Sequence, residues 1–269
     1  MIEKQPTTPV VLSIAGSDAF GGAGIQADIK TITTCGAYAA TAITCVTAQS
    51  SHGVFDIHPV PPSTVRSQID HIINDLPIHA VKLGMLYDLE IIEVVAKALE
   101  QIDCPIVIDP VMVASSSDSL IAENAFHAME ELLFPKATLL TPNIPEAKEM
   151  GHKHNDDQDW QEVAIDIGKK YGCAVLLKGG HTTSSILTDI LYDPKEEEIF
   201  CIKNPRIDTA NTHGTGCTLS SAIATYLAKG YTLKNAVING INYVHKLLDK
   251  SKEVKMHSKN GPMYHYLQK

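Results

Sequence analysis

The stretch that decides the fold runs from Val10 to Gly24 and reads VVLSIAGSDAFGGAG. Its first part, Val10–Ala15, is apolar apart from one serine, which predicts a buried strand. Four glycines follow within nine residues, and a helical pattern begins at about residue 23. A strand that passes through a glycine-rich turn into a helix is typical of an α/β fold whose turn approaches a ligand closely.

Outside this stretch the chain repeats the same order of strand and helix. Strands are predicted at 39–48, 54–60, 80–83, 106–108, 138–140 and 174–177, with a hairpin over 186–203. Helices are predicted at about 61–76, 89–100, 123–133, 143 onwards, 161–171, 216–229 and 233–249. We therefore expect one α/β domain over residues 1–269, with a mostly parallel central sheet flanked by helices on both faces. Residues 1–8 and 263–269 are predicted to be loose termini.

The composition excludes several classes of protein. The 269 residues carry 22 Lys and Arg against 31 Asp and Glu, and 44% of them are hydrophobic. This is a globular composition, and the lack of a Lys/Arg cluster argues against a nucleic-acid partner. The first apolar run, Val10–Ala15, is six residues long. A membrane span needs about 20 apolar residues and an export signal about 7–15, so we expect a cytoplasmic protein with no membrane partner.

Six cysteines stand at positions 35, 45, 104, 173, 201 and 217, and none forms a C-x-x-C pair. A zinc knuckle or a thioredoxin-like motif therefore does not fit, and free thiols are expected. Five of the six lie in or beside apolar stretches, where they are typical small core residues. Cys217 instead lies at the start of a predicted helix.

Ligands of parallel sheets bind beyond the carboxyl ends of the strands, so the segments that follow strands are the candidate sites. In the first such segment, residues 22–27 match the dinucleotide-binding pattern G-x-G-x-x-A. However, six residues separate the strand from the pattern, and the next predicted strand leads to Gln49 rather than to an acidic residue. A dinucleotide site is therefore disfavoured, and a plain glycine-rich turn and a different ligand site remain as alternatives.

Two further strand ends carry acidic residues. Asp109 follows the strand at 106–108, and Asn143 and Glu146 follow the strand at 138–140. Magnesium commonly binds one or two carboxylates together with phosphate oxygens and water, which makes Asp109 and Glu146 candidate ligands. Both have structural alternatives, because Asp before Pro caps a turn and Asn-x-x-Glu forms a helix-capping box.

The segment 211–221, NTHGTGCTLSS, places Gly214 and Gly216 on either side of Thr215 at a helix start. Free backbone N–H groups at such a start bind anions, and they suit a phosphoryl group in transfer. Cys217 lies in the same turn. A helix N-terminus lowers the pKa of a thiol from about 8.5 to about 3.5–7.5, which predicts a thiolate able to accept a proton. The alternative is a small buried side chain.

Lys178 begins the segment Lys-Gly-Gly-His after the strand at 174–177. It is either a cation for phosphate groups or a plain surface charge. The sequence contains no G-x-x-x-x-G-K-[ST], H-E-x-x-H or G-x-S-x-G motif. This excludes a P-loop NTPase and gives no support to a zincin or an α/β-hydrolase.

Seven segments in this order carry a family resemblance: GSDAFGGAGIQADIKT, TAQSSHGV, KLGML, DPVMVASSSDSL, TPNIPEA, LLKGGH and NTHGTGCTLSSAIA. They resemble the hydroxymethylpyrimidine/phosphomethylpyrimidine kinases of thiamine biosynthesis, in the ribokinase-like superfamily. The resemblance runs from about residue 9 to Pro262. It implies two ATP-dependent steps, which phosphorylate 4-amino-5-hydroxymethyl-2-methylpyrimidine and then convert the monophosphate into the diphosphate.

The resemblance also implies roles for single residues. Asp28 and Gln49 would form hydrogen bonds to the aminopyrimidine edge of the substrate. Gly16, Met85 and Val111 would line the pocket around its ring. The roles in phosphoryl transfer are a base at Cys217, an anion hole at Gly214, Thr215 and Gly216, ATP contacts from Lys178 and Asn143, and Mg²⁺ organised by Asp109 and Glu146 with Asn143. The family further implies a homodimer.

The chain departs from the family pattern at three positions. Phe20 stands where relatives have a small polar residue, and Ser115 and Ser117 stand where they have Lys and Gly. The loop around 115–117 is expected over the phosphates, so the lost cation bears on the strength of monophosphate binding.

A dinucleotide-dependent oxidoreductase is disfavoured together with the dinucleotide site. Two other functions stay open. A pyridoxal kinase of the same branch would use the same anion hole and Cys217 with a different ring pocket, and Gln49 favours the pyrimidine. A non-catalytic pyrimidine-binding protein would be expected to lack the groups for phosphoryl transfer. All four of these groups are present: Asp109, Glu146, Lys178 and Cys217.

Overall fold

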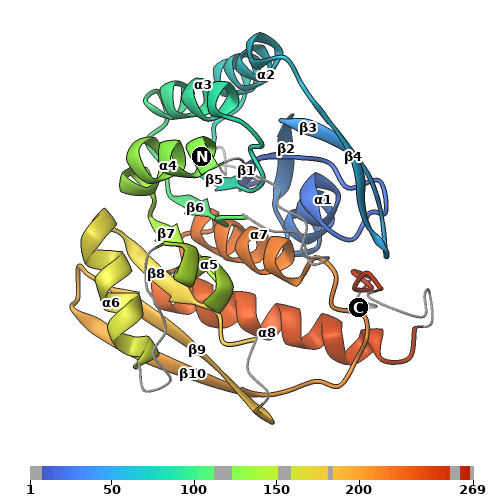
Figure 1. Cartoon of the computed structure of the whole chain (residues 1–269), viewed down its shortest axis with the longest axis vertical. Coiled ribbons are helices and arrows are strands. Elements are labelled where there is room, and N and C mark those ends of the chain that lie inside the picture. The colour runs from blue at the N-terminus through green and yellow to red at the C-terminus, as the bar shows by residue number, and fades with distance from the viewer. Residues whose placement is uncertain (1–7, 112–122, 151–158, 181–183, 255–260, 267–269) are drawn as a thin grey trace, which may run out of the picture.

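A computed structural model describes residues 8–111, 123–150, 159–180, 184–254 and 261–266. Within these residues, eight strands form one sheet in the order β10-β9-β8-β7-β6-β5-β1-β2 (Figure 1). The strands are β1 (Val10–Ala15), β2 (Tyr38–Ile43), β5 (Ala80–Leu83), β6 (Ile106–Ile108), β7 (Leu139–Leu140), β8 (Ala174–Leu177), β9 (Ile186–Asp193) and β10 (Glu198–Pro205). All neighbours from β2 to β8 are parallel, and β9 and β10 add an antiparallel edge. The predicted α/β class with a mostly parallel sheet is confirmed.

Helices cover both faces of this sheet. They are α1 (Gly24–Thr34), α2 (Pro62–Asp75), α3 (Leu89–Leu99), α4 (Glu123–Leu132), α5 (Ile144–Glu149), α6 (Trp160–Tyr171), α7 (Thr215–Ala228) and α8 (Leu233–Ser251), with a 3₁₀ turn at Phe134–Lys136. One face packs against α2, α3, α4 and α6, and the other against α1, α7 and α8. Figure 1 shows α7 and α8 side by side. No helix of the described residues is long and apolar enough to cross a membrane.

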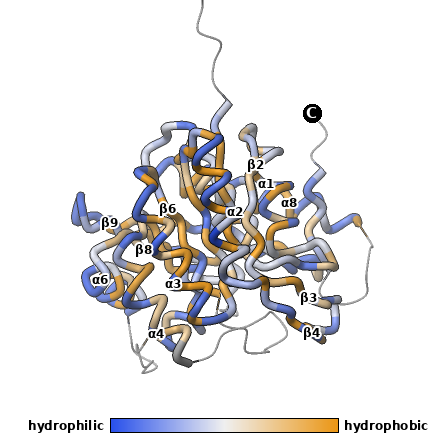
Figure 2. The backbone as a smooth tube through the Cα atoms, turned by 90° about the horizontal axis from the view of Figure 1, so that it is seen from above, coloured by the Kyte–Doolittle hydropathy of each residue, from blue (hydrophilic) through white to orange (hydrophobic). Residues whose placement is uncertain are grey.

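β1 shows why its sequence reads as a continuous apolar run. Leu12 and Ile14 point into the core on one face of the sheet, and Val11 points into the core on the other. Because both faces of a central parallel strand are covered, all six of its residues are buried. In Figure 2, apolar stretches run through β6 and β8 in the middle of the molecule, whereas much of α6 at its edge is hydrophilic.

The predicted strand over 39–48 divides in two. β2 ends at Ile43, whose backbone N–H and C=O both pair with the Gln68 side chain. At Thr44 the chain leaves the sheet, and β3 (Cys45–Ser50) pairs with β4 (Gly53–Pro59) in a separate two-stranded sheet. The hydroxyl of Thr44 donates to the Met85 carbonyl at 2.7 Å and fixes this bend.

The prediction of a loose segment over 263–269 is wrong for its described part. Met263 and His265 are buried, and the Thr218 hydroxyl lies 3.0 Å from Nε2 of His265. The segment Gly261–Tyr266 runs beside the residues that precede α7, where the His213 N–H donates to the Gly261 carbonyl. Pro262 forms a parallel bridge with His213. Residues 1–7 and 267–269 lie outside the described residues.

Candidate active site

The charged residues predicted at three strand ends lie together. Lys178, after β8, places its Nζ 2.9 Å from Oδ1 of Asp109, after β6, and 3.9 Å from Oε2 of Glu146, in α5. The Thr141 hydroxyl also donates to Oδ1 of Asp109. A Cβ built on Gly216 would lie 3.2 Å from Oδ2 of Asp109 and 3.5 Å from Nζ of Lys178. The start of α7 therefore adjoins a cluster of two carboxylates and one ammonium.

Burial and mutual charge set the ionisation of this cluster. Burial raises the pKa of Glu146 to about 7, the Asp109 charge adds to this rise, and Lys178 opposes it. Burial alone would lower the pKa of Lys178, but the charges of Asp109 and Glu146 outweigh it and raise that pKa. Lys178 therefore stays cationic and is not a plain surface charge.

Asn143 and Glu146 form the capping box that the sequence offered as an alternative. The Asn143 N–H donates to Oε2 of Glu146 at 2.7 Å, and the Glu146 N–H donates to Oδ1 of Asn143 at 2.8 Å. The cap and the charged cluster coexist, because the same carboxylate that closes the box lies beside Lys178.

The loop before α7 has a backbone conformation that requires glycine at position 214. Gly214 adopts φ 85° and ψ 12°, a left-handed conformation that favours glycine. A Cβ at this position would overlap the carbonyl oxygen of Gly22. The first N–H groups of an α-helix have no acceptor inside the helix. That of Thr215 donates to Thr212 at 3.3 Å, and those of Gly216 and Cys217 follow it at the start of α7.

One carboxylate joins the two glycine-rich loops. Oδ2 of Asp18 accepts the N–H groups of Gly22 and Ala23, and it lies 2.8 Å from Nε2 of His213. Burial opposes the ionisation of Asp18, but these hydrogen bonds hold its pKa below its usual value. Neither Asp18 nor His213 was predicted to belong to the site. Both could have been found from their positions, because each stands inside a glycine-rich segment. Phe20, a departure from the family pattern, packs its ring 5.8 Å from that of His213.

Cys217 lies in the first turn of α7 and is half-buried as a residue. A backbone hydrogen bond joins Gly24, the first residue of α1, to its thiol. The prediction of a lowered thiol pKa is wrong. Burial raises the pKa of Cys217 to about 11, and the nearby Lys82 only partly offsets this. The helix N-terminus is expected to lower this pKa, but the burial of the sulfur among protein atoms raises it by more.

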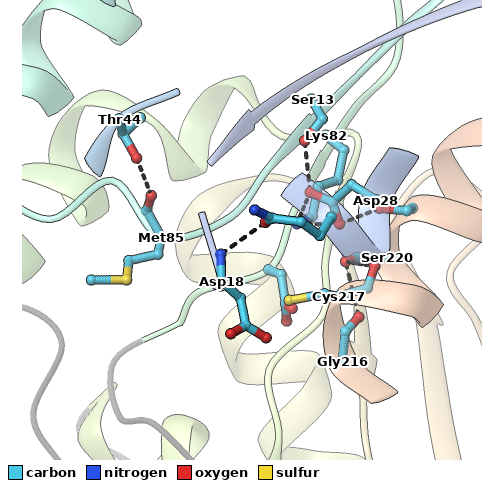
Figure 3. A network of polar contacts seen from close by, with 12 residues as sticks. Ser13, Asp18, Asp28, Thr44, Lys82, Met85, Gly216, Cys217 and Ser220 are labelled. Atoms are coloured by element: carbon cyan, nitrogen blue, oxygen red, sulfur yellow. Dashed lines mark hydrogen bonds and ion pairs between the residues drawn. The ribbon is translucent and has the colours of Figure 1, made fainter. Parts of the chain in front are cut away.

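Asp28, which is predicted to contact the substrate ring, lies in the protein interior in this structure. Asp28 is 0% exposed, and both carboxylate oxygens are engaged (Figure 3). Oδ2 accepts from Ser13 at 2.6 Å and from Lys82 at 2.8 Å, while Oδ1 accepts from Lys82 at 3.0 Å and from Ser221 at 2.7 Å. The sequence did not lead us to Lys82 as a partner of Asp28. The available indication was a lysine inside the otherwise apolar strand AVKL.

The other ring residues are only partly brought together. The Gly16 N–H donates to the Met85 carbonyl at 3.0 Å, and a Cβ on Gly16 would lie 2.6 Å from Sγ of Cys45. Gln49 is half-buried in β3, whose Thr47 hydroxyl donates to the Ser17 carbonyl. Val111 is half-buried and its N–H donates to Asp109. Ser115, Ser117 and most of the loop around them lie outside the described residues.

Residues 18–264 match the model of one family, phosphomethylpyrimidine kinase. The chain belongs to this family. The chain is 45% identical over 236 residues to a bifunctional thiamine biosynthesis protein of Geobacter sulfurreducens, and the match covers 87% of this chain and 48% of that relative. The chain thus spans about half of this relative's length.

Two solved structures resemble this chain closely. A phosphomethylpyrimidine kinase from Clostridium difficile is 38% identical with a TM-score of 0.76, and the match covers 88% of this chain and 98% of that one. The pyridoxal kinase of Staphylococcus aureus, in complex with ADP, is 32% identical with a TM-score of 0.86, and the match covers 97% and 94%. Both support the ribokinase-like fold. The second is a pyridoxal kinase, the class of enzyme that the sequence left as an alternative.

Asp18→Asn is expected to destabilise the protein at pH 7, because the amide cannot replace a carboxylate that accepts three backbone N–H groups and faces His213. Since the folded-state pKa of Asp18 lies below the usual value of 3.8, its charge contributes stability above about pH 4. That contribution is lost as the pH falls through the folded-state pKa. Urea unfolding at pH 7, 4 and 3 should therefore show a gap between the variant and the wild type that narrows with acid. A gap independent of pH would contradict this account.

Proposed function

We propose that this chain uses ATP to phosphorylate the hydroxymethyl group of 4-amino-5-hydroxymethyl-2-methylpyrimidine, and then converts the monophosphate into the diphosphate for thiamine biosynthesis. One observation carries the proposal. The start of α7 adjoins the Asp109–Lys178 pair on one side, and its Cys217 adjoins the glycine loop of α1 on the other. Phosphoryl transfer needs such positioning and neutralisation of charge more than covalent chemistry.

The proposed roles follow the geometry. Backbone N–H groups at Gly214–Cys217 hold the phosphoryl group in transfer, and Lys178 neutralises ATP phosphate charge beside Asn143. Cys217 faces the acceptor, and its thiolate form, which burial disfavours, takes the proton of the acceptor's hydroxyl group. Gly16, Met85, Val111 and Gln49 stay as proposed contacts of the pyrimidine ring.

We propose that Mg²⁺ accompanies ATP at Asp109 and Glu146. Among the residues described, no group of three or more His, Cys, Asp or Glu side chains forms a protein-only metal site. Two carboxylates beside a lysine fit a magnesium ion that takes its remaining ligands from phosphate oxygens and water. The ion would neutralise phosphate charge during transfer.

The second candidate function is a pyridoxal kinase, favoured by the structural similarity to the Staphylococcus aureus enzyme. Gln49 supports the pyrimidine, because an amide offers both a donor and an acceptor to an aminopyrimidine edge. The test is incubation with ATP, Mg²⁺ and each alcohol separately, with products identified by mass. We expect pyrimidine monophosphate followed by diphosphate. Faster turnover of pyridoxal would reverse the choice of substrate, and no phosphorylation of either alcohol would refute the kinase assignment for this chain.

We also propose a cytoplasmic homodimer. All six cysteines are free thiols, which suits a reducing compartment. The β3–β4 sheet stands apart from the main sheet and exposes 51% of Val46 and 71% of Phe55, which suits contact with a second copy. Sedimentation analysis should give a dimer, and Phe55→Ser should weaken it. A wild-type monomer at micromolar concentration would contradict the proposal.

A further inference from the structure

A buried ion pair lies behind the thiol and has no role in the proposed chemistry. Lys82 stands in β5 and is 0% exposed, as is its partner Asp28 in α1. A Cβ on Gly84 would lie 2.8 Å from Nζ of Lys82 and 3.0 Å from Cβ of Ala15, so the ammonium is closely confined. Removing two charges from water costs free energy, and this cost can exceed the gain from their attraction. Stabilisation of the fold therefore does not by itself explain the pair.

The pair is linked to Cys217 by two matching contacts between α1 and α7. Gly24 of α1 hydrogen-bonds the thiol of Cys217 in α7. Four residues further along each helix, the Ser221 hydroxyl donates to Oδ1 of Asp28 at 2.7 Å. One helical turn is about 5.4 Å, so the ion pair lies about one turn behind the sulfur. Figure 3 shows Cys217, Asp28 and Lys82 gathered from three different elements.

The two charges act on the thiol in opposite directions. Lys82 favours the thiolate, whereas Asp28 and also Asp109 disfavour it. The ammonium of Lys178, directly after β8, also interacts electrostatically with Cys217 and favours its thiolate. Asp28 accepts two hydrogen bonds from the ammonium of Lys82 and carries the opposite charge.

We propose that Lys82 and Asp28 are positioning residues that set the balance between thiol and thiolate at Cys217, Lys82 promoting the thiolate and Asp28 restraining it. A thiolate would accept the hydroxyl proton in the first phosphorylation. The kinetic meaning of the pair therefore rests on the proposed function, but its effect on the sulfur does not.

The test is the pH dependence of Cys217 alkylation by iodoacetamide, followed by mass spectrometry of the peptide that contains it, without ATP or substrate. Cys201, the exposed cysteine, is first replaced by serine to remove background reaction. Lys82→Met should raise the pH midpoint of alkylation and slow the reaction at pH 8 at least tenfold. Asp28→Asn should lower the midpoint. Ser221→Ala removes a hydrogen bond to Asp28 without changing charge, and should move the midpoint least.

Opposite shifts distinguish charge control from general damage to the fold. If both charge variants move the midpoint in the same direction, or neither moves it, the proposal is overturned. If Lys82→Met does not fold, Asp28→Asn decides alone, since an unchanged or raised midpoint contradicts the restraining role. The first phosphorylation should show the same pH shifts in kcat. A protein that passes the alkylation test but phosphorylates no pyrimidine would refute the proposed function and leave this inference standing.

Discussion

Cys217→Ala is expected to slow the first phosphorylation by about 10²–10⁴-fold, the usual contribution of a general base. The second phosphorylation should lose much less, because its nucleophile is a phosphate oxygen that is already anionic at neutral pH. The measurement is the single-turnover rate of each step, begun separately from the alcohol and from the monophosphate at saturating ATP.

The matched control is Cys201→Ala, which removes an exposed thiol on β10. Both rates should equal those of the wild type in this variant. Equal losses in the two steps of Cys217→Ala would show that the residue supports the site without taking a proton.

Gly214→Ala is expected to reduce kcat for both phosphorylations by about 10²–10³-fold, the range found when one donor of an oxyanion site is removed. The added Cβ would overlap the Gly22 carbonyl oxygen, so the loop before α7 must move away from the glycine loop of α1. Both steps should suffer alike, since in the proposed mechanism the same N–H groups hold the phosphoryl group in each. This pattern differs from that of Cys217→Ala.

Gly230→Ala separates backbone strain from the steric overlap. Gly230 has a φ of 82°, close to that of Gly214, but a Cβ there would meet nothing within 4 Å. It should show a loss of stability of about 1 kcal/mol, typical of a left-handed position, with unchanged kcat. If Gly214→Ala behaves like this control, with lower stability and normal turnover, the anion hole is not at this loop.

The sequence predicts the fold well where its signals are local. Apolar runs such as Val10–Ala15 give the strands, and glycines or acidic residues directly after them mark the ends that gather at the site. Asp109, Glu146 and Lys178 lie together for this reason, since parallel strands bring their carboxyl ends to one edge. The capping box at Asn143 is equally local.

What the sequence does not reveal depends on contacts between distant residues. Asp28 and Lys82 stand 54 positions apart, and a lysine in a four-residue strand does not show that its charge is buried against a helix on the sheet. The same applies to Asp18 and His213, which stand 195 positions apart. The pKa of Cys217 was predicted in the wrong direction because the helix start is visible in the sequence and the protein atoms around the sulfur are not.

The packing of Gly261–Tyr266 against the start of α7 matters for anyone who shortens or tags this protein. The Asn211 side chain is already anchored to the carbonyls of Ser251 and Val254, and Gly261 and Pro262 then flank His213. A version cut after Val254 would keep all the helices and strands of the described residues, yet lose one wall of the proposed phosphate-binding loop. Such a product would give a normal circular dichroism spectrum and run near full length on a gel, but we expect it to turn over little substrate. Neither measurement would therefore show whether a preparation is active.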